Sequence, residues 1–357
     1  MPSRLVAPLA LLAAVASTGA AGAIGAAIPT LDPSGLPALP AQGLVVQRAG
    51  DVLLESTGGA VIGRLAGFSV DPPAKLTDAR FARSVGIQAL AGADPALTVL
   101  FDRSGAGWTL DVAGRRLRPI GAIETPLAGG AMLRVIVDRQ GEGVSTLTVV
   151  ERGGKRLLSG RSVATVGGRY VATNDSYDPK PNTLLDLATG RRTTLGARCV
   201  LAGVHAGGAI AACAPSDVTN ASGIYRFASD GARRLLTRIG PGAYPTTASL
   251  SPDGRWVLLY LQPNCGPGWA AIAPSGGGPA RFVAGGGRVP VTAAPGRAAP
   301  PFSWALGWTA QSRIVATITG KGSCEGDVTT GTYTIDPATL AATRATAARA
   351  AKLWGAV

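Results

Sequence analysis

Histidine is almost absent from this chain, and aromatic and acidic residues are scarce. The 357 residues include one histidine, His205, with 5% aromatic residues and 21 acidic residues against 34 basic ones. A nucleophile–histidine site would have to be built on His205, which falls in a predicted strand-to-strand turn that offers little cavity. The sequence also has no G-x-S-x-G elbow, phosphate-binding loop or dinucleotide-binding fingerprint in a fitting context. We therefore expect a binding protein without a cofactor rather than an enzyme.

Cysteines are few, and no two of the four have the C-x-x-C spacing of a zinc site, so no metal is expected. The N-terminal segment indicates whether the cysteines reach an oxidising compartment. Arg4 precedes an apolar run over residues 5–16, and small residues follow at Ala20, Ala23 and Ala27. This pattern predicts an export signal over residues 1–28. The alternative is an uncleaved membrane anchor, which would make the chain a sensor ectodomain.

A repeated hairpin organises the remaining sequence. Turn glycines recur at intervals of 39, 37, 41 and 46 residues, at Gly114, Gly153, Gly190, Gly231 and Gly277. This spacing is close to the roughly 40 to 45 residues of a four-stranded propeller repeat. An apolar run precedes each hairpin, and a further short candidate strand precedes each run. The first of these candidate strands is residues 86–90, GIQAL. Six complete four-stranded units result.

An earlier copy at residues 43–65 has only three strands, and the chain ends in KLWGAV from Lys352. A C-terminal strand that fills the missing inner place would close the ring. We therefore predict an all-β propeller of seven four-stranded antiparallel blades over residues 43–357, preceded by a proline-rich linker at 29–42. The alternatives are six blades with an accessory N-terminal hairpin, and a terminal helix over residues 340–354.

The turn Ser251-Pro252-Asp253-Gly254-Arg255-Trp256 resembles the signature of the WD40-like, TolB-type propeller repeat family. In that signature a Ser-Pro-Asp-Gly turn precedes basic, aromatic and apolar residues. The equivalent turns at residues 167–170 and 309–312 depart from it. The resemblance implies a propeller and names no ligand. Members of the family are periplasmic interaction platforms or accessory domains beside peptidases.

Topology pairs the four cysteines. Cys199 and Cys213 lie opposite each other in a predicted hairpin centred near Ala206, while Cys265 and Cys324 fall in equivalent loops of consecutive blades. In an oxidising compartment we expect these two disulfides. The alternative for the first pair is two buried free thiols, because direct cross-strand bonds are geometrically demanding.

Acidic residues recur at the ends of predicted inner strands. Asp102, Asp138 and Asp175 close three successive strands, and the following loops contain Glu142, Tyr177 and Asp178. We expect all six on the loop-rich face as binding candidates. Paired acids there would bind Ca²⁺ or serve a glycan-active hydrolase or lyase. Single acids at strand ends more simply cap the next loop.

Basic residues form the clearest pattern. The net charge is +13, and four basic pairs follow the outer turns of successive blades: Arg115, Arg116, Lys155, Arg156, Arg191, Arg192, Arg233 and Arg234. This set, here called the basic rim, either blocks pairing of edge strands or binds anionic envelope polymers or phospholipid headgroups.

The export signal and the lack of interleaved aromatic residues argue against nucleic acid as the partner. We predict an exported, monomeric, non-enzymatic platform for a protein or an anionic envelope polymer. It would contact a membrane only through an uncleaved N-terminal segment.

Overall fold

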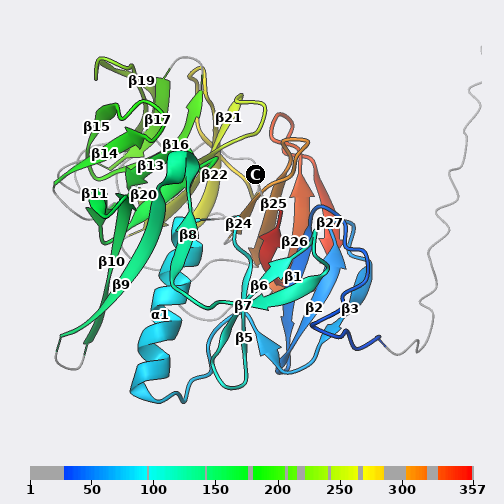
Figure 1. The fold of residues 1–357 in the computed structure, drawn as a ribbon. Coiled ribbons are helices and arrows are strands. Elements are labelled where there is room, and N and C mark those ends of the chain that lie inside the picture. Colours follow the sequence, from blue (N-terminus) through cyan, green and yellow to red (C-terminus); the bar gives the residue numbers. More distant parts are fainter. Residues whose placement is uncertain are drawn as a thin grey trace, which may run out of the picture.

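The structure is a computed structural model that describes residues 28–94, 96–140, 143–175, 180–205, 208–214, 222–239, 243–263, 268–284, 303–319 and 329–355. These residues form 28 β-strands, the α-helix α1 (Asp78–Ala93) and the 3-10 helix η1 (Ala128–Gly130) (Figure 1). The predicted all-β class is therefore confirmed. Neither helix in this part of the chain is long and apolar enough to cross a bilayer.

Five separate sheets contain four antiparallel strands each. The first consists of β28 (Ala350–Trp354), β1 (Gly43–Arg48), β2 (Asp51–Ser56) and β3 (Val61–Leu65). The second consists of β4 (Phe68–Ser69), β5 (Val99–Asp102), β6 (Gly107–Asp111) and β7 (Arg116–Pro119). The third consists of β8 (Glu124–Pro126), β9 (Met132–Gln140), β10 (Gly143–Arg152) and β11 (Lys155–Gly160).

The fourth sheet consists of β12 (Val163–Val166), β13 (Tyr170–Thr173), β14 (Pro181–Asp186) and β15 (Arg192–Ala197). The fifth consists of β16 (Cys199–His205), β17 (Gly208–Cys213), β18 (Ser222–Phe227) and β19 (Arg233–Ile239).

The remaining eight strands form one sheet made of two antiparallel groups. One group consists of β20 (Ala243–Leu250), β21 (Trp256–Pro263), β22 (Trp269–Pro274) and β23 (Arg281–Phe282). The other consists of β24 (Ser303–Trp308), β25 (Ile314–Thr319), β26 (Thr329–Ile335) and β27 (Ala342–Thr346). A single parallel bridge between Trp269 and Ser303 joins the two groups. The predicted outer hairpins and the inner strands that precede them are all present in these sheets.

The core lies between the faces of consecutive sheets and is built mainly from small and aliphatic side chains. Between the fifth sheet and the β20–β22 group, for example, Val200, Ile224 and Ile239 pack with Val257 and Ala271. Alternate residues of each strand point to opposite faces, so one strand serves the core on both of its sides. Because each sheet supplies two faces, the hydrophobic clusters run from one sheet to the next.

Helix α1 corrects one sequence prediction. Residues 86–90, predicted as the short strand before the first apolar run, lie inside this helix, and the two-residue strand β4 takes that place in the second sheet. The buried residues Ser84, Ile87 and Leu90 recur every three positions, which is helical spacing, and a five-residue window was too short to show it. Helix α1 packs on β9 and β10, where an ideal Cβ at Gly86 would lie 2.7 Å from Val137 Cγ2 (Figure 1).

The two ends of the described chain meet in the first sheet. Strand β28 pairs antiparallel with β1, as predicted, and the blue and red strands lie side by side in Figure 1. The Trp354 indole is 1% exposed, and its Nε1 donates to the Pro40 carbonyl at 3.0 Å. An ideal Cβ at Gly43 would lie 2.1 Å from this ring, so β1 needs glycine there. The alternative of a helix over residues 340–354 is wrong, because β27 and β28 cover most of them.

Residues 29–36, the first part of the predicted linker 29–42, lie along the outer edges of two sheets. The Leu31 amide donates to the Arg64 carbonyl, and the Arg64 amide donates to Pro29, each at 2.8 Å. At β7 the Leu117 amide donates to the Pro33 carbonyl at 2.7 Å. The segment is thus held to β3 and β7 by main-chain hydrogen bonds.

The turn between β20 and β21 has the predicted geometry. Gly254 has a φ of +70°, and its amide donates to the Ser251 carbonyl at 2.8 Å. Asp253 Oδ1 accepts from the Ser251 hydroxyl and the Arg255 amide. In the degenerate turn between β24 and β25, Ser312 takes the equivalent position with a φ of +57°. The backbone conformation therefore persists where the sequence signature does not.

Trp354→Ala should lower the free energy of unfolding by about 3 to 5 kcal/mol, because it empties a buried site and removes a hydrogen bond. Trp304 is 43% exposed and gives a matched control, since Trp304→Ala should cost about 1 kcal/mol. Urea unfolding of the disulfide-intact protein would measure both losses. Equal losses for the two variants would show that β28 contributes little to stability.

Gly254→Ala should cost about 1 to 2 kcal/mol through the left-handed backbone conformation. The new Cβ would also meet the His205 ring, but His205 is exposed and its ring can turn aside. Gly276 is an exposed turn glycine without a positive φ and without neighbours within 4 Å of an added Cβ, so Gly276→Ala should change stability by less than about 0.5 kcal/mol. Indistinguishable denaturant midpoints for the two variants would count against a requirement for glycine at 254.

Candidate functional site

Asp102 caps the loop that follows its own strand. Its Oδ1 accepts hydrogen bonds from the Ser104 amide and hydroxyl and from the Ala106 amide, and its Oδ2 accepts from Trp108 Nε1 at 2.9 Å. Burial acts to raise the pKa of Asp102, but these donors outweigh it and hold the pKa below its ordinary value. Both carboxylate oxygens are therefore engaged within the β5–β6 turn.

The other binding candidates predicted from the sequence that the structure describes belong to different sheets. Asp138 is exposed on β9, and Asp175 follows β13, where its carbonyl accepts from Asn182 Nδ2 at 2.9 Å. Glu142, Tyr177 and Asp178 lie outside the described residues. Over the parts of the chain that the structure describes, no three His, Cys, Asp or Glu side chains come close enough to hold a metal ion.

The predicted bond between Cys199 and Cys213 is confirmed. These residues pair across β16 and β17 in the expected register, with 3.9 Å between their Cα atoms. Cys265 and Cys324 lie outside the described residues, so the second bond stays a prediction.

All eight side chains of the basic rim are exposed, and they sit on or beside the edge strands β7, β11, β15 and β19. Several of them touch neighbouring parts of the molecule. An Arg191 guanidinium nitrogen donates to the Ser229 carbonyl in the next sheet, and one of Arg192 donates to Leu157 in the preceding sheet. Arg233 lies over the Tyr225 ring, 5.6 Å from its centroid. The rim therefore has a structural role between sheets as well as a positive charge.

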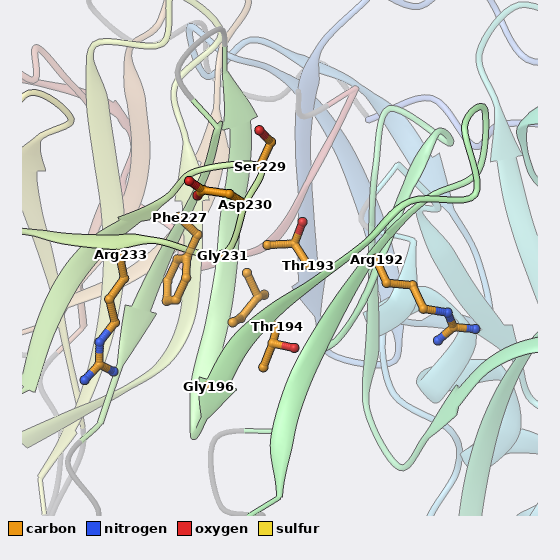
Figure 2. A pocket seen from close by; sticks show the side chains of 10 residues that line it. Arg192, Thr193, Thr194, Gly196, Phe227, Ser229, Asp230, Gly231 and Arg233 are labelled. Carbon is orange, nitrogen blue, oxygen red and sulfur yellow. The ribbon is translucent and has the colours of Figure 1, made fainter.

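A groove of about 460 Å³ runs between β15 and the β18–β19 turn. One wall is β15, with Arg192, Thr193 and Thr194, and the other contains Phe227, Ser229, Asp230, Gly231 and Arg233. Figure 2 shows Arg192 and Arg233 on opposite sides of the groove, with their side chains directed away from each other. The sequence analysis missed this groove, because its walls come from two sheets whose relative placement no local pattern encodes.

An aromatic pair was also missed. The rings of Tyr260 on β21 and Trp304 on β24 have centroids 4.5 Å apart, and Trp304 is 43% exposed. The Tyr260 hydroxyl accepts from the Gly268 amide at 3.1 Å, and burial raises the pKa of Tyr260. The pair joins two strand groups that are separated in sequence.

No protein-family model and no curated protein matches this sequence. Among solved structures, the chain is similar to TolB from Acinetobacter baumannii, with 13% identity over 60% of this chain and 57% of TolB and a TM-score of 0.33. It is also similar to an acylaminoacyl peptidase from Pyrococcus horikoshii, with 11% identity over 82% of this chain and 51% of the peptidase and a TM-score of 0.40.

A third similarity is to an oligogalacturonate lyase in complex with manganese, with 11% identity over 89% of this chain and 86% of the lyase and a TM-score of 0.39. The aligned part thus spans little more than half of the TolB and peptidase chains. At these TM-scores no binding or catalytic property transfers from the three proteins.

Asp102→Asn should lower the free energy of unfolding at pH 7 by about 1 to 2 kcal/mol, because the loop loses its charged acceptor. A lowered folded-state pKa means that the carboxylate contributes fully above its unfolded value of about 3.9 and that the contribution is lost as the pH falls through the folded value. Urea unfolding at pH 7 and pH 2 should therefore show the gap between wild type and variant narrowing in acid. A gap of constant size would contradict the capping role.

Proposed function

We propose that this chain is an exported, non-enzymatic seven-bladed propeller that binds an anionic partner through its basic rim. The observation that carries the proposal is the exposure of four basic pairs on the edges of four successive sheets. Clustered positive charge raises the local concentration of an anionic partner and speeds its association. In an exported protein, such a partner is an acidic protein segment or an anionic envelope polymer.

The blade number rests on sheet composition. The five separate four-stranded sheets and the two four-stranded groups of the large sheet make seven repeats of similar build. The β28–β1 pairing supplies the inner strand of the first repeat from the C-terminal end, which supports a ring closed between the first and last repeats. A closed ring of seven blades would present the rim strands as one continuous outer surface.

Export is supported by the signal-like residues 1–28 and by the disulfide. Cys199–Cys213 joins adjacent strands, and such bonds persist in oxidising compartments such as the periplasm or the cell exterior. We propose one of these locations and a monomeric platform.

The test places equal charge changes at two locations. In the rim variant, Arg116, Arg156 and Arg234 are replaced by glutamate, while Arg191 and Arg192 keep their contacts between sheets. In the control variant, the exposed loop residues Lys75, Arg103 and Arg161 are replaced by glutamate. Binding to immobilised poly-L-glutamate would be measured as a function of salt concentration.

We expect the wild-type affinity to fall with salt. The rim variant should lose about tenfold in affinity and the control variant less than about threefold, because the two differ only in where the charge changes. Equal losses would assign the binding to net charge alone, and a larger loss in the control would assign it to the loop-rich face. Either result, or an absence of binding by wild type, would overturn the proposal.

A further inference from the structure

The outer edge of β15 is uncharged beyond its first residue, whereas several other sheet edges are covered by chain or carry more charge. Strand β15 ends the fourth sheet, and no other strand of the described chain pairs with its outer edge. After Arg192 at its start, β15 continues with the uncharged residues 193–197. An open, uncharged edge presents main-chain donors and acceptors to a further strand.

Several other edges are covered, charged or short. The residues 29–36 lie along β3 and β7 and make main-chain hydrogen bonds with both. Strand β19 contains Arg233, Arg234 and Arg238, β23 has only two residues, and the Leu157 carbonyl of β11 is occupied by Arg192. The chain therefore already uses an extended segment to cover two sheet edges, and it leaves a groove beside β15.

The groove gives an added strand a second wall. The opposite wall is the β18–β19 turn, where the Ala228 amide donates to Ala232 at 2.8 Å and the Gly231 amide donates to Ala228 at 3.0 Å. The Ala232 amide also donates to Asp230 Oδ1 at 2.9 Å. Arg191 links this wall to the β14–β15 turn through the Ser229 carbonyl. Both walls are thus fixed before a ligand arrives, which lowers the entropic cost of binding.

Charge selects the occupant. Arg192 and Arg233 lie on opposite sides of the groove with their side chains directed away from each other (Figure 2), and one guanidinium nitrogen of Arg192 donates to the Leu157 carbonyl. Their positive charges still lie beside the groove, Arg191 and Arg234 adjoin them in sequence, and Asp230 is the only acidic residue of the lining. All four arginines are exposed. An extended segment that carries carboxylates would therefore be attracted, and a basic one repelled.

We propose that an acidic peptide segment from a protein partner adds to the edge of β15 as a further strand within this groove. The strand supplies main-chain hydrogen bonds, and the arginines at the two sides select carboxylate side chains. The four residues 193–196 span about 13 Å, which sets the bound segment at roughly four to six residues. This proposal names a site that the rim proposal does not require.

The probe is a fluorescein-labelled peptide, Glu-Val-Glu-Val-Glu-Val, titrated with the full protein by fluorescence anisotropy. Thr194 is exposed and lines the groove, so Thr194→Trp fills the space without changing charge. Thr343 is an equally exposed threonine on the edge strand β27, away from this groove, and Thr343→Trp is the matched control. A peptide methylated on its valine main-chain nitrogens tests the ladder hydrogen bonds.

We expect saturable binding to wild type and to Thr343→Trp, and at least about tenfold weaker binding to Thr194→Trp and of the methylated peptide. A Lys-Val-Lys-Val-Lys-Val peptide should also bind at least about tenfold more weakly. Equal binding in any of these three comparisons, or no saturable binding by wild type, would overturn the proposal. Arg116 and Arg156 belong to the rim but do not line the groove, so the double variant Arg116→Glu/Arg156→Glu should weaken poly-L-glutamate binding and leave peptide binding unchanged, which distinguishes failure of this site from failure of the rim.

Discussion

The hydrogen bonding of β28 to β1 joins residues more than 300 positions apart, and three groups of strands depend on it. In the first sheet, β28 supplies the strand beside β1 and places Trp354 against Gly43. Towards the second sheet, Lys352 Nζ donates to the Val99 carbonyl at 3.0 Å, and burial lowers the pKa of this amine. Towards β25, the Thr317 hydroxyl donates to the Ala350 carbonyl at 3.2 Å. One five-residue strand thus makes contacts that no local sequence could make.

Arginine side chains provide a second kind of connection, between separate sheets and between the two groups of the eight-stranded sheet. Arg152 donates to the Leu187 carbonyl at 2.7 Å, and Arg281 donates to Pro337 and Ala338 at 3.0 Å, in the same manner as Arg191 and Arg192. A planar guanidinium offers several donors, so one nitrogen can bond a carbonyl while the charge stays in solvent. The high arginine content therefore serves the packing of neighbouring sheets and the surface potential together.

The hairpins could be predicted because turn residues mark them locally in the sequence. The C-terminal strand could be predicted because the first repeat lacked a fourth strand. Gly231 of the repeated hairpins and Gly254 of the Ser-Pro-Asp-Gly turn both have the positive φ values of tight turns. Three strands at residues 43–65 lacked an inner partner, which pointed to the chain end. Helix α1 was missed because residues 86–90 are apolar in a short window, and its helical period shows only over 16 residues. The groove could not be predicted, because Thr194 and Ser229 meet only when two sheets are packed.

The arginines beside β15 both discourage pairing of its edge with a second copy of the chain and favour an acidic partner. An open edge such as β15 would be prone to pairing with a second copy of the chain, and bulky charge near an edge opposes this. With a net charge of +13 and arginines on both sides of the groove, one copy repels another, whereas an acidic segment gains attraction at the same place. The bulge near Gly196, which has a φ of +94°, bends the end of β15 and limits how long an added strand can be. Positive charge and a short accessible edge therefore favour a brief acidic segment over a long or neutral strand.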